Sequence, residues 1–212
     1  MSTSENITIQ IKGKTPIKYE QYLTKDKVAA ECIEFLIECI NDLFKVKIVT
    51  SKLRNSIDLS YFKTIIDPCC GEGAFVRVIG EHDNLFYFDI DAIDPEYRHD
   101  YLKLEDELLI HKKPYLTIMS PPFGKDNCLV INFFNKAAKY SSVIAIVVPF
   151  SFNQPSVINS LNINFHKICQ LTMPKNSFIF KGKDHNSNCE FQVWIKSTSK
   201  LIDGYSIERE KI

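Results

Sequence analysis

The stretch Asp67-Pro68-Cys69-Cys70-Gly71-Glu72-Gly73-Ala74-Phe75 decides the fold, because it joins an apolar run to a short segment that is predicted to be helical. The run at 64–66 is typical of a buried strand that ends at Asp67. Glycine at 71 and 73 lets the backbone turn tightly and approach a ligand closely. A dinucleotide fold would carry a third glycine and cradle a pyrophosphate. Here an acid leads the loop, and it suits an ammonium group better than a phosphate.

Similar apolar runs recur along the chain at 85–88, 116–119 and 143–148, and further strand candidates lie at 167–172 and 191–195. Continuous apolar strands suit a parallel sheet that is buried on both faces. A helix is expected over 25–44 with Thr24 as its N-cap, and a crossover helix over 132–139. The alternation predicts a doubly wound α/β fold, whose ligands bind beyond the carboxyl ends of the strands.

The 212 residues are expected to form one domain, with residues 1–15 flexible. No run approaches the roughly 20 apolar residues that span a bilayer, and the N-terminus lacks the features of a signal peptide. We therefore expect an intracellular, soluble protein, cytoplasmic or nuclear, with no membrane partner. Its seven cysteines are expected to be reduced, and their spacing predicts no metal site.

Charge is distributed unevenly, although the formal net charge is zero. Residues 81–107 hold ten acids and two bases, whereas residues 164–200 hold six lysines and two acids. A net charge of zero argues against binding nucleic acid through bulk charge alone. Opposite charges on two segments fit a molecule with one side that faces an anion, while a solvated face explains any single run.

The stretch at 67–75 resembles the first motif of S-adenosylmethionine-dependent amino-methyltransferases, D-P-x-C-G-x-G-x-F, at every defined position. The resemblance implies the Rossmann-like, mostly parallel sheet of seven strands that is typical of class I methyltransferases. It implies S-adenosylmethionine as the cofactor and S-adenosylhomocysteine as its product. It assigns cofactor contacts to Asp67, Cys69, Gly71, Gly73 and Phe75.

Further cofactor positions follow along the chain. Asp89, which closes the second strand, could accept hydrogen bonds from both ribose hydroxyls, and in another register Asp94 takes this role. Asp100 matches the family's third motif, whose side chain accepts a hydrogen bond from the adenine amino group. Tyr101 beside it would cover the adenine ring.

A segment upstream of the first strand adds to the resemblance. Gln21, Tyr22 and Thr24 match the Q-F/Y-x-T segment of amino-methyltransferases whose cofactor motif precedes the catalytic one. In that family the segment wraps over the methionine part of the cofactor, so the resemblance assigns these three residues to cofactor binding.

Ser120-Pro121-Pro122-Phe123 ends the strand predicted at 116–119. It resembles the N/D/S-P-P-Y/F/W motif of enzymes that methylate exocyclic amines of adenine or cytosine, or glutamine amides. The lone pair of such an amine is delocalised, which makes the nitrogen a poor nucleophile. The Ser120 side chain and the Pro121 carbonyl could accept its two hydrogens, and the prolines would fix the turn. Phe123 would stack on the target base, a contact worth roughly 1–3 kcal/mol.

Serine at 120 and the order of the motifs point to different bases. Adenine enzymes of this class usually carry Asn or Asp there, and serine is commoner among N4-cytosine enzymes. The order found here, with the Q-Y-x-T segment first, the cofactor motif second and the catalytic motif last, is typical of adenine enzymes. We therefore predict methylation of adenine N6 and keep cytosine N4 as the alternative.

The segment 173–183 places aromatic residues among lysines. In related enzymes a loop at this place supplies a second aromatic face for the flipped base. Phe178 or Phe180 could do so, with Lys181 and Lys183 near phosphate. Core aromatics with solvated lysines explain the same pattern.

The resemblance covers residues 19–196 and implies a nucleic acid substrate, DNA or RNA, with a flipped or unpaired target base. We expect no large target-recognition domain of the kind found in sequence-specific DNA methyltransferases. It is similar in length and motif order to compact adenine methyltransferases of ribosomal RNA, which work with a small activator. The resemblance therefore allows a protein activator or recognition subunit as a partner. Protein glutamine methylation and an inactive subunit that keeps the fold are the rival interpretations.

Overall fold

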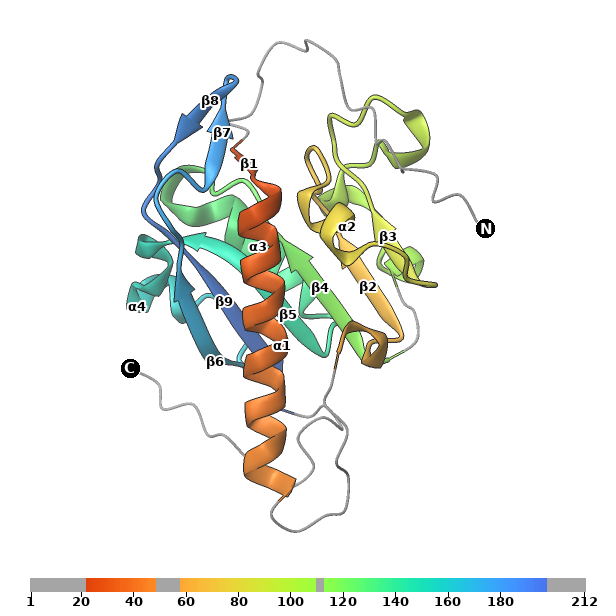
Figure 1. Ribbon diagram of the computed structural model, residues 1–212, viewed down its shortest axis with the longest axis vertical. Coiled ribbons are helices and arrows are strands. Elements are labelled where there is room, and N and C mark those ends of the chain that lie inside the picture. Colours follow the sequence, from red (N-terminus) through yellow and green to blue (C-terminus); the bar gives the residue numbers. More distant parts are fainter. Residues whose placement is uncertain (1–21, 49–57, 110–112, 198–212) are drawn as a thin grey trace.

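A computed structural model describes residues 22–48, 58–109 and 113–197, without the side chains of 44–48. Its centre is a six-stranded sheet in the order β3-β2-β4-β5-β9-β6 (Figure 1). The strands are β2 (Thr64–Asp67), β3 (Leu85–Tyr87), β4 (Tyr115–Met119), β5 (Val143–Pro149), β6 (Phe165–Thr172) and β9 (Cys189–Lys196). The first four are parallel, and β9 runs antiparallel between β5 and β6. The expected α/β fold with a mostly parallel sheet is confirmed.

Helices cover both faces of this sheet. α1 (Asp26–Ile48) and α2 (Ala74–Ile79) lie side by side on one face, and α3 (Cys128–Ala137) packs on the other. Alternate residues of β5 serve the two layers, with Val143, Ala145 and Val147 in the cluster of α1 and Ile144, Ile146 and Val148 in that of α3. All six are fully buried, which is why this strand is apolar without alternation.

Short elements complete the described part of the chain. They are α4 (Pro155–Ile158) and the 3-10 helices η1 (Leu59–Tyr61), η2 (Pro95–Tyr97), η3 (Tyr101–Lys103), η4 (Asp106–Leu109), η5 (Lys125–Asn127) and η6 (Phe150–Asn153). A second sheet, β1-β7-β8, is formed by β1 (Leu23–Thr24), β7 (Phe178–Phe180) and β8 (Lys183–His185). Figure 1 shows it beyond the carboxyl ends of β2 and β4.

The described residues form six strands in the main sheet, where seven were expected. Between β3 and β4 the chain makes the 3-10 helices η2, η3 and η4 and adds no strand in its described part. In the described residues of that segment, the one isolated bridge is a parallel pair between Asp89 and Arg98. The segment is rich in acids and carries Pro95, which cannot donate to a ladder.

Two details of the expected helices are wrong. Thr24 is not the N-cap of α1, because it lies in β1 and the helix begins at Asp26. The crossover helix begins at Cys128, four residues earlier than expected. Within the described ranges no helix is long and apolar enough to cross a membrane.

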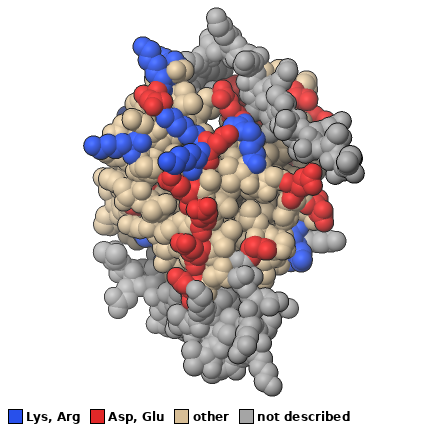
Figure 2. Space-filling view, viewed as in Figure 1, with Lys and Arg blue, Asp and Glu red and all other residues tan. Residues whose placement is uncertain are grey.

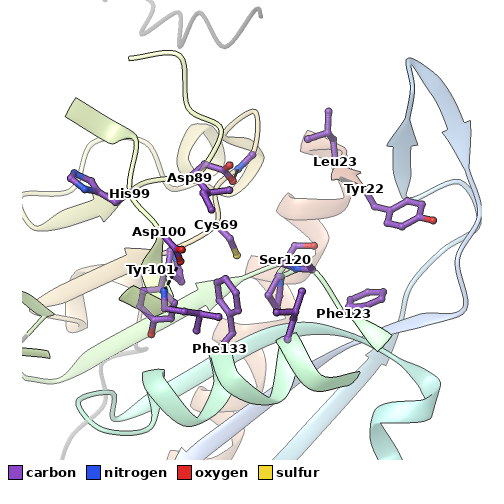
Figure 3. A pocket seen from close by; sticks show the side chains of 18 of the residues that line it. Tyr22, Leu23, Cys69, Asp89, His99, Asp100, Tyr101, Ser120, Phe123 and Phe133 are labelled. Carbon is purple, nitrogen blue, oxygen red and sulfur yellow. Dashed lines mark hydrogen bonds between the residues drawn. The ribbon is translucent and has the colours of Figure 1, made fainter. Parts of the chain in front are cut away.

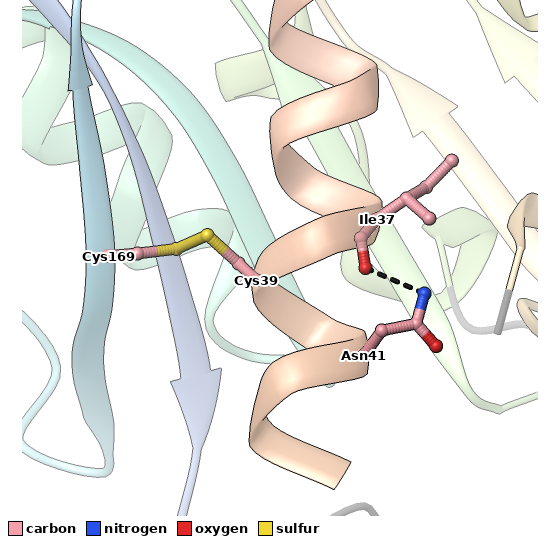
Figure 4. The surroundings of a disulfide bond; sticks show 4 residues. All are labelled: Ile37, Cys39, Asn41 and Cys169. Carbon is pink, nitrogen blue, oxygen red and sulfur yellow. Dashed lines mark hydrogen bonds between the residues drawn. A yellow bond between two sulfur atoms is a disulfide. The ribbon is translucent and has the colours of Figure 1, made fainter. Parts of the chain in front are cut away.

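One pair of cysteines overturns the expectation that all thiols are reduced. Cys39 of α1 and Cys169 of β6 form a disulfide, with their Cα atoms 6.5 Å apart (Figure 4). That separation is within the usual range for a disulfide. The two residues are 130 positions apart, and they meet only because α1 crosses the sheet near its β6 edge. The other five cysteines are free.

Candidate active site

A cavity of about 750 Å³ opens beyond the carboxyl ends of β2, β3 and β4 (Figure 3). Its volume is that of a site for a cofactor-sized molecule. Residues from every motif of the sequence contribute to its wall: Tyr22, Cys69, Gly71, Asp89, Asp100, Tyr101, Ser120, Pro121, Pro122, Phe123 and Phe178. The expectation that ligands bind beyond the strand ends thus agrees with the position of this cavity.

The glycine loop follows β2 directly and forms one side of the cavity. Gly71 and Gly73 have φ angles of +54° and +80°, which other residues rarely adopt. The N–H of Gly71 donates to Oδ2 of Asp89 at 2.9 Å, and Oδ1 of Asp89 accepts from the N–H of Asp91. Asp89 is therefore fixed against the loop from the end of the neighbouring strand.

Asp67 ends β2 and is almost completely buried, with 1% of its surface exposed. Burial raises its pKa to about 8, and the nearby Asp89 adds to the shift. Asp67 shares a smaller void of about 30 Å³ with Thr24, Gly71 and Phe75. The Thr24 hydroxyl is buried there without a hydrogen-bond partner. Phe75 also packs on Phe191 of β9, with ring centroids 6.4 Å apart.

The raised pKa of Asp67 makes stability depend on pH. The pKa of Asp67 is higher in the folded protein than in the unfolded chain, so its protonated carboxyl adds to the free energy of unfolding. This contribution is complete below about pH 4 and is lost as pH rises through 8. One such group changes stability by about 1.4 kcal/mol per pH unit. Asparagine does not ionise, so the free energy of unfolding of Asp67→Asn, relative to that of the wild type, should rise by up to roughly 4 kcal/mol between pH 5 and pH 8. Urea denaturation at both pH values measures this, and parallel pH profiles would contradict the assignment.

The two candidates for the ribose contact lie in different places. Asp89 lines the cavity, whereas Asp94 caps η2 by accepting from the N–H of Glu96 and does not line it. Asp100 also lines the cavity and is oriented by the N–H of Leu102 and by Lys103 at 3.0 Å.

Tyr101 forms a buried floor beside Asp100. Its ring packs on Phe133 of α3 at 5.2 Å between centroids, and its hydroxyl bonds to that of Tyr140. Burial raises the pKa of Tyr101 well above its usual value. Tyr101 is therefore a rigid neutral wall of the cavity.

The Ser120-Pro121-Pro122-Phe123 turn follows β4 and forms the wall of the cavity across from Asp89 and Asp100 (Figure 3). Ser120 lines both the cavity and the smaller void. Burial is the main cause that raises the pKa of the Cys69 thiol, and a hydrogen bond with the Ser120 backbone opposes the shift. The Phe123 carbonyl accepts from Leu129 and Val130, which fastens the end of the turn to the start of α3.

The second sheet brings the N-terminal segment and the lysine-rich hairpin together. Leu23 pairs with Ile179 and Thr24 with Phe178. Tyr22 stacks on Phe180 at 4.9 Å between centroids. The two segments predicted to contact cofactor and substrate are therefore neighbours, and Tyr22 and Phe178 from them both line the cavity.

Of the five residues expected to contact the substrate, Phe123 lines the cavity, and the four from the segment 173–183 separate into two groups. Phe178 lines the cavity, whereas Phe180, Lys181 and Lys183 do not. The two lysines are exposed at the turn of the β7–β8 hairpin, and Lys181 lies 5.1 Å from the Phe180 ring. Gln21 lies outside the described residues.

Several lining residues were missed by the sequence analysis: Leu23, His99, Leu102, Lys125, Leu129, Phe133 and Ser187. Leu23 and His99 are direct neighbours of predicted residues, so their sequence positions gave a signal. Phe133 gave no such signal, because an aromatic residue in a predicted helix is expected to belong to the hydrophobic core. Among the described residues no group of three or more His, Cys, Asp or Glu is arranged to hold a metal ion.

No protein-family model and no curated protein matches the sequence. Solved structures do match. PH1948 from Pyrococcus horikoshii, provisionally described as an RNA methyltransferase, is 17% identical with a TM-score of 0.54, over 88% of this chain and 93% of PH1948. The 23S rRNA methyltransferase ErmE is 12% identical with a TM-score of 0.49, over 87% of this chain and 73% of ErmE. The likeness to PH1948 shows a shared Rossmann-like α/β fold.

Proposed function

We propose that this chain is an S-adenosylmethionine-dependent methyltransferase that acts on the N6 amine of adenine in nucleic acid. One observation carries the proposal. A single cavity is lined by the glycine loop after β2, by Asp89 and Asp100, and by the Ser120-Pro121-Pro122-Phe123 turn. Each segment resembles a separate methyltransferase motif, and chance matches would have no reason to share one cavity.

The cofactor fits the polar groups of the glycine-loop side. The hydroxyl of Thr24 is buried without a partner, a state that costs about 1–3 kcal/mol and that a polar ligand group would relieve. The buried carboxyl of Asp67 suits an ammonium, since a nearby cation favours ionisation. Asp67, Thr24 and Gly71 would thus hold the methionine part, Asp89 the ribose and Asp100 the adenine. The bound cofactor supplies an electrophilic methyl group.

The residues of the Ser120-Pro121-Pro122-Phe123 turn act on the target amine. Ser120 Oγ and the Pro121 carbonyl accept its hydrogens and orient its lone pair, and Phe123 stacks on the base. Phe178, Leu129 and Phe133 make much of the remaining wall apolar. That lining excludes water, which strengthens each hydrogen bond to the amine.

Nucleic acid is favoured as the substrate by the charges around the site. Figure 2 shows lysine and arginine gathered in the upper half of one face, toward the β7–β8 hairpin, and acids running down its centre. Exposed acids on α1 recur every four residues at Glu34, Glu38 and Asp42. A phosphate backbone would approach Lys181 and Lys183 and avoid α1.

The Thr24→Val variant separates cofactor binding from stability. Valine has nearly the same shape, so the apo protein should gain about 1 kcal/mol of unfolding free energy by losing an unpaired buried hydroxyl. S-adenosylmethionine should bind about tenfold more weakly, a loss of about 1.4 kcal/mol. Calorimetric titration and urea denaturation measure the two effects.

Thr117→Val is the matched control, because the equally buried Thr117 hydroxyl is bonded to Ser141 at 2.6 Å. It should lower stability and leave cofactor affinity unchanged. If Thr24→Val behaves in the same way, the Thr24 hydroxyl does not contact the cofactor.

Incubation with isotopically labelled S-adenosylmethionine tests the substrate class. RNA, DNA and protein are offered separately, with RNA first because PH1948 is described as an RNA methyltransferase. We expect label in nucleic acid. Label in protein alone would replace the proposal by glutamine-amide methylation. Unlabelled products from all three would favour an inactive methyltransferase-fold subunit.

A further inference from the structure

Arg77 of α2 joins two segments that are distant in sequence and adjacent at the candidate site. Its Nε and Nη2 donate to Oδ2 and Oδ1 of Asp26, at 3.0 and 2.6 Å. Its Nη1 donates to the backbone carbonyl of Glu72. One guanidinium therefore holds both the first turn of α1 and the middle of the glycine loop.

Both partners of Arg77 lie close in the sequence to residues that line the cavity or the smaller void. Asp26 comes two residues after Thr24, and Glu72 stands between Gly71 and Gly73. Leu23 already lies close to the loop, since a Cβ built on Gly71 would be 3.1 Å from Leu23 Cδ2. The gap between the N-terminal segment and the loop is thus bridged by Arg77 on the outer side.

We propose that Arg77 is a positioning residue, which fixes the separation between residues 23–24 and the glycine loop through its paired contacts to Asp26 and Glu72. The inference rests on the proposed function, because the groups so aligned are those assigned to the cofactor. Arginine suits this role since its planar fork makes two parallel bonds to a carboxylate and still has donors left for the carbonyl. Lysine could keep the charge but not this geometry.

Hydrogen exchange of the apo protein tests the positioning directly. The Lys25 amide donates to the Ser177 carbonyl at 3.1 Å, and the Gly71 amide donates to Asp89 at 2.9 Å. These two amides report on the N-terminal segment and on the loop. Arg77→Ala should speed the exchange of both, and Asp26→Asn that of Lys25. The amides of β4 and β5 should keep their wild-type rates.

Cofactor titration gives the second readout. Arg77→Ala should weaken S-adenosylmethionine binding about two- to fivefold, because the pair is partly exposed and screened by water. Arg77→Lys should recover only part of this loss. The double variant Arg77→Ala/Asp26→Asn should bind S-adenosylmethionine no more weakly than Arg77→Ala, since both changes break the same contact between Arg77 and Asp26.

Lys139→Ala is the control, because it breaks an ion pair of 2.6 Å with Asp106 away from the cavity wall. Unchanged exchange at Lys25 and Gly71 in Arg77→Ala, or the same changes in Lys139→Ala, would overturn the proposal. If Arg77→Ala also speeds hydrogen exchange in β4 and β5, the test rests on the exchange of the Lys25 and Gly71 amides in the milder variants Arg77→Lys and Asp26→Asn. Failure of the wild type to bind S-adenosylmethionine would refute the proposed function alone, since the exchange readout needs no cofactor.

Discussion

The Gly71→Val variant is expected to lose binding of S-adenosylmethionine by at least about 100-fold, or about 2.7 kcal/mol, while the main sheet stays folded. The Cβ of residue 71 would lie 3.1 Å from Leu23 Cδ2, and the two valine methyl groups reach further from the backbone. They would enter the space between the loop and Leu23, both of which line the cavity. Calorimetric titration measures the loss.

Backbone strain has to be separated from this obstruction, because Gly71 has a φ of +54° that a β-branched residue strongly disfavours. Gly80 offers the matched control, since its φ is +68° and nothing lies within 4 Å of its Cβ position. Gly80→Val should lose similar stability and keep its cofactor affinity. Equal cofactor affinity in Gly71→Val and wild type would remove the glycine loop from the cofactor site.

The Ser120→Ala variant is expected to lose about 10²–10³ in turnover, or 2.7–4 kcal/mol, the typical cost of one preorganised hydrogen bond at a transition state. Its cofactor affinity should hardly change, because Ser120 acts on the target amine, which is absent from the binary complex. Single-turnover rates and calorimetric titration measure the two quantities. Wild-type turnover would show that residue 120 does not hold the amine.

Two further variants separate the roles within the turn. Ser120→Asn rebuilds the acceptor usual in adenine enzymes and should keep measurable activity on the same nucleoside. Phe123→Ala removes the stacking face, so it should weaken substrate binding as well as turnover. Loss of turnover alone in Phe123→Ala would contradict a stacking role.

Local pattern was sufficient for the main sheet. The apolar runs at 64–66 and 143–148 became β2 and β5 within a residue or two, because burial on both faces leaves a continuous apolar signature. The glycine loop and the turn after β4 could be placed at strand ends because each begins where an apolar run ends. Their placement in one cavity agrees with the sequence analysis, and their individual roles stay predictions.

Contacts between distant segments were not predictable. The disulfide between Cys39 and Cys169 depends on how α1 crosses the sheet, and neither residue has a local signal for it. The pairing of β1 with β7 involves only two residues of β1, too few for a periodicity. The expected cap at Thr24 failed because that residue pairs in this small sheet. The sequence likewise did not show that Asp89 lines the cavity and that Asp94 does not.

The identity of the methylated nucleoside tests the central claim most directly. Wild type and Ser120→Ala are incubated with labelled S-adenosylmethionine and RNA or DNA, and the digested nucleosides are separated by mass spectrometry. The account predicts labelled N6-methyladenine nucleoside from the wild type and about 10²–10³ less from Ser120→Ala in the same time. Labelled N4-methylcytosine, or equal yields from the two proteins, would contradict it.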